Sequence, residues 1–387
     1  MPASSWASTS SMAIDRRRFV AGALVALTAP RAVLAAEARA AGHAGADVVY
    51  AAAARRQGNG YAVLLVTGDG RILREIPLTA RAHDIAIDRA RRRAVACARR
   101  PGYFALAFDL DGRARPEVFA PPEDRHFYGH GAFSPDGRVV YMTEHDVDTG
   151  EGVIGVYDTG NGFRRVGEFP SYGIGPHEAI LLADGKTLVA ANGGFGSDPA
   201  TGRESIDVAG MAPNMSFIDV ETGALKAQHG LPPEINLLSI RHLAADASGA
   251  VWFGGQWQGA IEDAPELIGR ARLDRPIAFV EPGGPAGDAL RGYIGSVAVC
   301  AEGRLLAASA PRAGRVVYAD TETGRIVHEV ALKDACGLAG SGPGAFAISS
   351  GHGVVRVEGV AQEAGGLETR FPSTEFDNHL RRARGQR

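Results

Sequence analysis

Histidine is the residue type whose spacing in this chain points most clearly to chemistry. Four of the 11 histidines stand just before a short apolar segment, a turn and a second apolar segment: His83, His130, His177 and His242. One copy reads "PHEAILLADGKTLVAA" and another "AHDIAIDRARRRAVACA", and a fifth histidine, His379, lies in "FDNHL" near the end of the chain. Imidazole nitrogen binds copper, zinc and iron, so histidines brought together by a repeat predict a metal site.

Two further segments align with the same repeat. "IGSVAVCAEGRLLAAS" has Gly295 at the histidine position, and "ACGLAGSGPGAFAISS" has Cys336 there. The chain has 3 cysteines in all, too few for a disulfide framework. In an oxidising compartment, a free thiol at such a position is prone to oxidation unless it binds a metal or is buried. We therefore predict a metal ion held by members of one set: His83, His130, His177, His242, Cys336 and His379.

The repeat also predicts the elements that position these residues. Successive copies begin about 41 to 65 residues apart, and each is followed by two more strands joined by a turn such as the Asp-Thr-Gly of "GVIGVYDTGNGFRRVGEF". A period of this length with several strands per unit is typical of a β-propeller, in which the first strand of each blade lines a central channel. Residues 46–80 supply only three strands, and "FDNHL" supplies one more.

The predicted fold is therefore all-β, a seven-bladed β-propeller over residues 46–380 closed by its C-terminal strand. Closure of this kind removes the open sheet edge that would otherwise pair with another molecule. Residues 195–215 form a loop insertion inside the fourth blade, which accounts for the widest interval of the repeat.

A structural interpretation stands beside the metal hypothesis. A histidine that starts an inner strand can simply hydrogen-bond a neighbouring blade, and "PH…DG" resembles the repeat of lactonase-type propellers. A residue inherited by duplication needs no site. The two interpretations differ in whether the imidazole nitrogens find protein partners.

The N-terminal residues predict export. Arg16, Arg17 and Arg18 precede an apolar run that begins at Phe19, and small residues follow near Ala35, which together indicate a twin-arginine signal peptide over residues 1–35. The run is too short to span a bilayer, so we expect no transmembrane segment in a mature, periplasmic protein.

Composition limits the function classes. The net charge of −3 becomes about −6 without the four arginines and one aspartate of residues 1–35, so we expect neither nucleic acid nor a membrane surface as partner. The chain has no glycine-rich phosphate loop and no Ser-His-Asp order, and we expect no nucleotide cofactor.

The chain resembles the bacterial domain of unknown function 1513 family. The resemblance rests on "DRRRF", "HFYGHGAFSPDGRVVYMTE", "GIGPHEAILLADGKTLVAANGG", "LSIRHLA", "YIGSVA", "ACGLA" and "FDNHL", with Phe376 where the family pattern leads us to expect tryptophan. It implies an exported propeller, and it implies iron acquisition with an imelysin-type periplasmic protein as partner. It implies no reaction.

The sequence thus predicts a periplasmic metal-binding accessory protein in iron or copper handling. Two alternatives remain open. One is a lactonase-like hydrolase or an oxidoreductase, with His177 and Glu178 at the channel entrance and a metal that activates water. The other is a docking platform for a protein partner.

Overall fold

The computed structural model of this protein describes most of the chain after residue 48. The described residues are 49–58, 60–197, 205–206, 208–281, 284–285, 287–360 and 366–384. The predicted signal peptide over residues 1–35 lies outside them.

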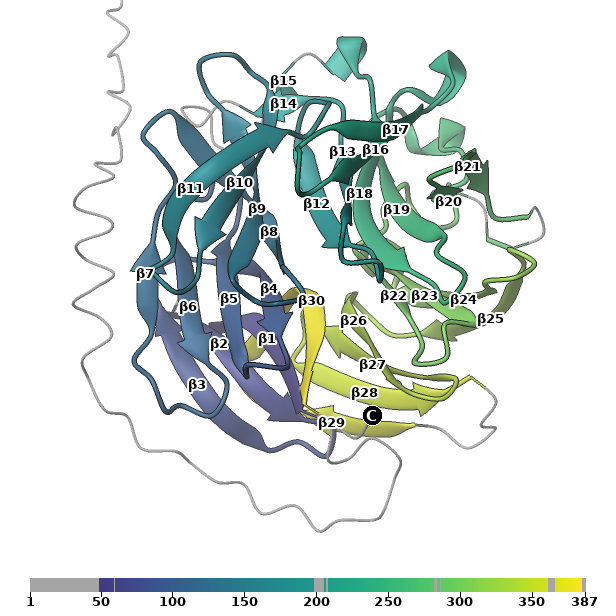
Figure 1. Ribbon diagram of the computed structural model, residues 1–387. Coiled ribbons are helices and arrows are strands. Elements are labelled where there is room, and N and C mark those ends of the chain that lie inside the picture. The colour runs from purple at the N-terminus through teal and green to yellow at the C-terminus, as the bar shows by residue number, and fades with distance from the viewer. Residues whose placement is uncertain are drawn as a thin grey trace, which may run out of the picture.

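Seven four-stranded antiparallel sheets are arranged around a central channel (Figure 1). From the innermost strand outward, the first sheet has β30 (Thr374–Arg384), β1 (Val49–Arg56), β2 (Gly60–Thr67) and β3 (Ile72–Leu78). The second has β4 (Ala82–Asp88), β5 (Arg93–Ala98), β6 (Ala105–Asp109) and β7 (Glu117–Phe119). The third has β8 (Arg125–Phe133), β9 (Val139–Asp146), β10 (Gly152–Asp158) and β11 (Arg164–Pro170).

The remaining sheets follow the same order. The fourth has β12 (Pro176–Leu181), β13 (Thr187–Asn192), β16 (Asn214–Asp219) and β17 (Leu225–Gly230). The fifth has β18 (Leu238–Ala245), β19 (Val251–Trp257), β20 (Ile268–Arg272) and β21 (Arg275–Phe279). The sixth has β22 (Ser296–Val299), β23 (Leu305–Ala310), β24 (Arg315–Asp320) and β25 (Ile326–Ala331). The seventh has β26 (Ala335–Gly342), β27 (Ala345–Ser350), β28 (Val354–Gly359) and β29 (Leu367–Arg370).

The ring closes as the sequence predicts. Strand β30 pairs antiparallel with β1, with Ala52 opposite Leu380, and so forms the innermost strand of the first blade (Figure 1). It runs to Arg384, four positions past the expected end at residue 380. Because the last strand completes the first sheet, the seven-bladed propeller has no blade left open.

The core lies between neighbouring blades. Phe119 of the second sheet packs against Phe127 and Tyr157 of the third, with ring centroids 6.0 and 5.2 Å apart. Val355 of the seventh sheet and Phe376 of the first belong to one buried cluster, so packing also joins the two ends of the ring. Burial of apolar faces between sheets holds the inner strands in place around the channel.

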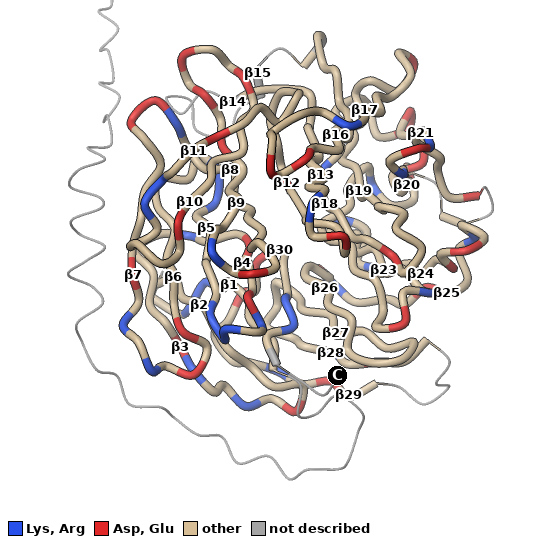
Figure 2. The backbone as a smooth tube through the Cα atoms, in the orientation of Figure 1, with Lys and Arg blue, Asp and Glu red and all other residues tan. Residues whose placement is uncertain are grey.

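Short elements complete the structure. The predicted insertion at 195–215 contains the two-stranded β14 (Gly196–Ser197) and β15 (Ser205–Ile206) and the 3-10 turn η1 (Val208–Gly210). Three other 3-10 turns are η2 (Pro233–Ile235), η3 (Ile261–Asp263) and η4 (Pro311–Ala313). Within the described residues no helix has the length and apolar character needed to cross a bilayer. Acidic and basic residues alternate over the backbone of the blades (Figure 2).

Candidate metal centre

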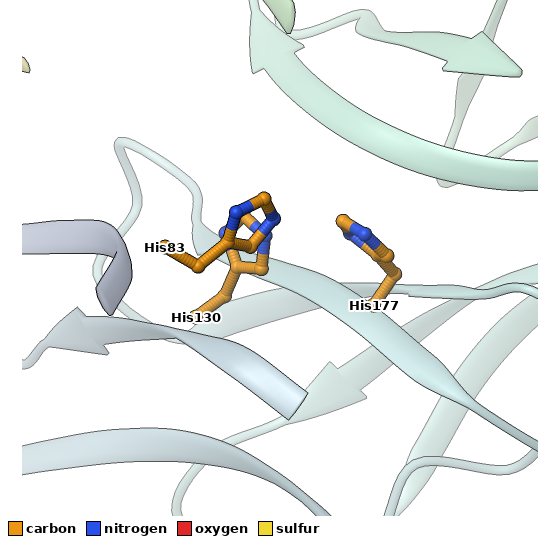
Figure 3. Close-up of side chains that lie close together, drawn as sticks. All are labelled: His83, His130 and His177. Atoms are coloured by element: carbon orange, nitrogen blue, oxygen red, sulfur yellow. The ribbon is translucent and has the colours of Figure 1, made fainter. Parts of the chain in front are cut away.

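Five histidines from five different inner strands meet in the channel. They are His83 of β4, His130 of β8, His177 of β12, His242 of β18 and His379 of β30, and all are buried. The centroids of neighbouring rings lie between 4.7 and 6.2 Å apart. Figure 3 shows three of them, with the rings of His83, His130 and His177 turned toward the same space. The repeat of the sequence therefore corresponds to one compact imidazole cluster.

A β-bulge accompanies each histidine. In β12 the pairing with β13 shifts between Pro176 and Glu178, so that His177 is the extra residue. In β4 the shift lies between Ala82 and Ile85, around His83. Similar shifts lie around His130 in β8, just before His242 in β18 and before Leu380 in β30. An extra residue re-aims the side chains beside it, so the bulges allow adjacent residues of one strand to enter the channel.

Cys336 lies in a bulge of β26, but its side chain is engaged elsewhere. The Cys336 thiol donates to the main-chain oxygen of Asp334 at 3.1 Å, and the residue belongs to none of the groups of close ligand atoms that the described residues form. Burial, followed by the negative charge of Asp334, raises the pKa of this thiol far above its ordinary value, which disfavours the thiolate that a metal requires. The structure thus groups the five histidines and places Cys336 apart from them. Whether any of the six residues binds a metal stays a prediction.

Three buried carboxylates lie behind the histidines. The Nδ1 atom of His83 lies 3.0 Å from Asp377 Oδ1, and that of His130 lies 3.0 Å from Asp84 Oδ2. The Nδ1 atom of His242 lies 3.6 Å from Glu178 Oε2, just beyond hydrogen-bond distance. When Nδ1 donates its proton to a carboxylate, the lone pair of Nε2 is left free as a ligand, and this arrangement is common around bound metals.

Arginines hold these carboxylates ionised. Arg381 donates two hydrogen bonds to Asp84, at 2.7 and 2.8 Å, and one to Glu178 at 2.6 Å. Burial has the largest single effect on Glu178 and raises its pKa, but Arg381 and the neighbouring histidines together outweigh burial and lower that pKa to about 2. The same balance holds the pKa of Asp84 well below its usual range. Asp377 is paired in the same way with Arg99, at 2.7 Å, and with Arg81.

Four of the five histidines, His83, His177, His242 and His379, are held neutral at ordinary pH. Burial lowers the pKa of His83 to about 3, with a further contribution from the positive charge of Arg99. Burial also lowers the pKa of His242 to about 4 and that of His177 and His379 well below the ordinary value. Neutral imidazole is the form that binds a metal, so the channel presents these side chains in their ligand state without a proton to displace.

Several imidazole nitrogens have no hydrogen-bond partner although they are buried. They are Nε2 of His130 and His379, Nδ1 of His177 and both ring nitrogens of His242. A buried polar atom without a partner costs about 1–3 kcal/mol, and such atoms are uncommon in native proteins. Their concentration in one cluster favours a ligand over the interpretation of the histidines as structural contacts between blades.

The distances suit a metal ion. Three groups of side chains have ligand atoms within 4.8 Å of one another: His83, His130 and His177; His130, His242 and His379; and Asp84, His130 and Glu178. Metal–nitrogen distances of about 2.0–2.1 Å separate two ligands of one ion by up to about 4.2 Å, so small side-chain movements would bring either histidine group into contact with an ion. His130 belongs to all three groups and lies at the centre of the site.

The sequence did not identify Asp84, Asp377 and Arg381 as members of this site. A signal for them exists, because an acidic residue stands next to a histidine in "HD" at 83–84 and "HE" at 177–178, and two positions before one in "DNH" at 377–379. Strict alternation would turn such neighbours to opposite faces of the strand. The bulges bring both the histidine and its acidic neighbour into the channel.

Comparison with known proteins agrees with this description. The fold and the imidazole cluster define a seven-bladed β-propeller with a histidine-lined channel. The chain belongs to the family described as "Protein of unknown function (DUF1513)", whose model matches residues 76–383. Among curated proteins, the comparison finds no relative of this sequence.

Solved structures share the fold. Hydrazine synthase of Kuenenia stuttgartiensis is similar with a TM-score of 0.57 and 14% identity, over 82% of this chain and 91% of that one. The β-propeller domain of Cps50 (Swd1) of Myceliophteria thermophila is similar with a TM-score of 0.54 and 14% identity, over 82% of this chain and 95% of that one. At this level of identity the likeness establishes the architecture and carries no function.

Proposed function

We propose that this propeller binds a first-row transition-metal ion, iron or copper, among the histidines of its central channel. The observation that carries the proposal is the state of His130. Its Nδ1 atom faces Asp84, while its buried Nε2 has no hydrogen-bond partner among the described residues. His130 also belongs to two groups of three histidines whose ligand nitrogens lie within 4.8 Å of one another. Metal ligation would satisfy that nitrogen and others of the cluster at once.

The donor set supports a metal that accepts several imidazoles. Nitrogen ligands suit copper, iron, nickel and zinc, whereas calcium and magnesium prefer oxygen. The second layer of Asp84, Asp377 and Glu178 would orient the rings and make the ligand nitrogens more basic. The two histidine groups share His130, so an ion in either group would use this residue.

The biological setting is proposed from the sequence. The twin-arginine pattern at Arg16–Arg18 supports export to the periplasm, and the family resemblance supports a role in iron acquisition beside an imelysin-type protein. An exported protein of this kind would act as an accessory that holds or delivers the ion.

The enzyme alternative makes a different demand on Glu178. A hydrolase would use this carboxylate on water or substrate, but its two oxygens already accept from Arg381, at 2.6 Å, and from the main-chain nitrogen of Leu243, at 3.1 Å. This engagement supports a positioning role for Glu178 rather than that of a general base. Lactone turnover that is lost in the variant His177→Ala would instead support the enzyme.

Metal analysis of protein exported from its native host tests the proposal. Wild-type protein is expected to carry close to one equivalent or more of iron or copper, and the double variant His83→Ala/His177→Ala is expected to lose most of it. His328→Ala, at an exposed position of β25 outside the channel, is the matched control and keeps the metal. Thermal unfolding would show that the double variant is folded.

Two results would contradict the proposal. One is folded wild-type protein without metal that also takes up none from solution. The other is a double variant with the metal content of the wild type. A docking platform alone would further predict that a protein partner binds equally well when all five histidines are alanine.

A further inference from the structure

A cavity opens onto the histidine cluster at one mouth of the channel. It measures about 520 Å³, and His83 and His177 are part of its lining. Its other walls come from inner-strand residues such as Arg241 and Asn378, from residues that follow second strands, such as Arg99, and from the insertion residue Phe195. A volume in this range is typical of sites for small organic molecules, and a bare inorganic anion would leave most of it unfilled.

The cavity lining is strongly basic. Among the described residues it includes four arginines, Arg99, Arg100, Arg241 and Arg312, and one carboxylate, Asp334. Of these arginines, Arg99 is already paired with the buried Asp377. Elsewhere on the blades the two signs of charge are mixed (Figure 2). Arg99 and Arg241 also contribute to the lowered pKa of His83 and His177, respectively, after burial, so the positive charge of the mouth acts on the proposed metal ligands.

Aromatic rings orient three of these guanidinium groups. Arg312 lies 4.4 Å from the ring centre of Tyr293, Arg241 lies 4.9 Å from that of Phe195, and Arg100 lies 5.3 Å from that of Tyr128. A guanidinium close to an aromatic ring is attracted to the ring face, and guanidinium groups pair well with the two oxygens of a carboxylate. The amides of Gln256 and Gln258 add hydrogen-bonding groups to the same lining.

The opposite mouth is basic as well. A second cavity of about 910 Å³ lies at the other end of the inner strands, lined by Leu181, Leu243 and Ala339 among others. Four arginines contribute to it, and no aspartate or glutamate does. Arg381 is paired with Asp84 and Glu178, and Arg92 is paired with Asp111. Arg89 and Arg382 lie beside Arg381. A free metal cation would therefore meet a repulsive field at either entrance.

We propose that the 520 Å³ cavity binds a small organic polycarboxylate, and that the metal enters the channel as the anionic complex of such a ligand. Entry of the metal as an anionic complex rests on the proposed metal-binding function. Polycarboxylate binding in the cavity does not. The carboxylates would pair with Arg241 and Arg312 at the mouth. A metal held by the ligand would then lie next to His83 and His177, which could replace carboxylate oxygens by imidazole nitrogens.

Calorimetric titration of citrate into the metal-stripped full-length protein tests polycarboxylate binding. Citrate is expected to bind the wild type. The variant Arg312→Gln, at an exposed site, is expected to lose at least about tenfold in citrate affinity, and Arg100→Gln/Arg312→Gln should lose more. Arg275→Gln removes an exposed arginine from the outer strand β21 and should bind as the wild type does. Inorganic phosphate is expected to bind much more weakly than citrate.

The outcomes separate the two proposals. Citrate binding that is absent in the wild type, unchanged in the Arg100→Gln/Arg312→Gln variant, or matched by phosphate overturns the polycarboxylate site. The variant His130→Ala, outside this cavity lining, should keep citrate binding and lose metal uptake from ferric citrate. If it keeps both, the metal site fails while the polycarboxylate site stands. If the Arg100→Gln/Arg312→Gln variant takes up metal from ferric citrate as fast as the wild type, delivery as an anionic complex is wrong.

Discussion

At the scale of single residues, the channel pairs imidazoles with ionised carboxylates. His83 and His130 each direct Nδ1 at a carboxylate, and the arginines behind those carboxylates keep them charged. The charge needed to balance a metal cation is therefore one layer away from the ligands. We therefore expect the carboxylates to contribute almost as much to metal affinity as the histidines do.

Replacement of Asp84 by asparagine tests that layer. Asp84→Asn removes the negative charge shared by His130 and Arg381 and leaves a single acceptor oxygen where the carboxylate offers two. We expect metal affinity to fall about 10–100-fold. Competition with a chelator of known affinity measures it, and Asp263→Asn at an exposed position is the control. Unchanged affinity in a folded Asp84→Asn protein would show that the carboxylate has no part in the site.

The lowered histidine pKa values predict how the metal-free protein responds to acid. An unfolded chain takes up protons at histidine near pH 6.5, whereas His242 in the folded protein does so near 4 and His83 near 3. Between those values the unfolded state binds more protons, so stability is fully present above about pH 6.5 and is lost as the pH falls. Each such histidine contributes a slope of up to about 1.4 kcal/mol per pH unit.

Urea unfolding of metal-free protein at several pH values between 7 and 4 measures this slope. The double variant His83→Gln/His242→Gln should show a smaller slope than the wild type. Equal slopes for the two proteins would mean that the buried histidines are not the groups whose protonation unfolds the protein.

At the scale of elements, the inner strands carry the site through their bulges. In β8 the pairing with β9 is interrupted between Phe127 and Gly131, and Gly129 within that interval has φ = +107°. A β-carbon added at Gly129 would lie 3.0 Å from Cδ2 of His83. Gly129 therefore serves both the strand and the site. It permits the backbone conformation of the bulge, and it leaves space for the His83 ring.

Gly129→Ala is expected to destabilise the protein by about 1–3 kcal/mol and to weaken metal binding, because the methyl group displaces the His83 ring. Gly150→Ala is a matched control, since Gly150 also has a positive φ, +78°, and has nothing within 4 Å of an added β-carbon. Denaturant unfolding and metal titration measure both effects. Equal behaviour of the two variants would assign the whole effect to the backbone and none to His83.

The bulges also mark where sequence reasoning stops. The strand pattern and the turns predict which residues begin each inner strand, and so they predict that His83, His130, His177, His242 and His379 share a place in the blades. Alternation within a strand would turn Glu178 away from His177, so the sequence leaves open whether Glu178 reaches the channel. One extra residue in β12 breaks that alternation and brings Glu178 into the channel, and the sequence carries no periodic signal for it.

At the scale of the whole molecule, closure of the ring brings the site together. Strand β30 completes the first blade and at the same time supplies His379, Asp377 and Arg381 to the channel. The repeat period and the unmatched strand at each end made this closure predictable. Cys336 shows the limit of that reasoning. The repeat predicts the position of its main chain, but its thiol hydrogen-bonds to the main-chain oxygen of Asp334 instead of joining the histidines.

The location of a metal in the closed ring is the central claim, and anomalous X-ray diffraction tests it most directly. Crystals of protein purified from its native host would be measured on both sides of the iron and copper absorption edges. We predict an anomalous peak in the channel about 2.0–2.1 Å from Nε2 of His130, with nitrogens of further histidines of the cluster at similar distances. A well-ordered channel without a peak, with the nitrogens of His130, His177, His242 and His379 hydrogen-bonded to water or to one another, would contradict the account.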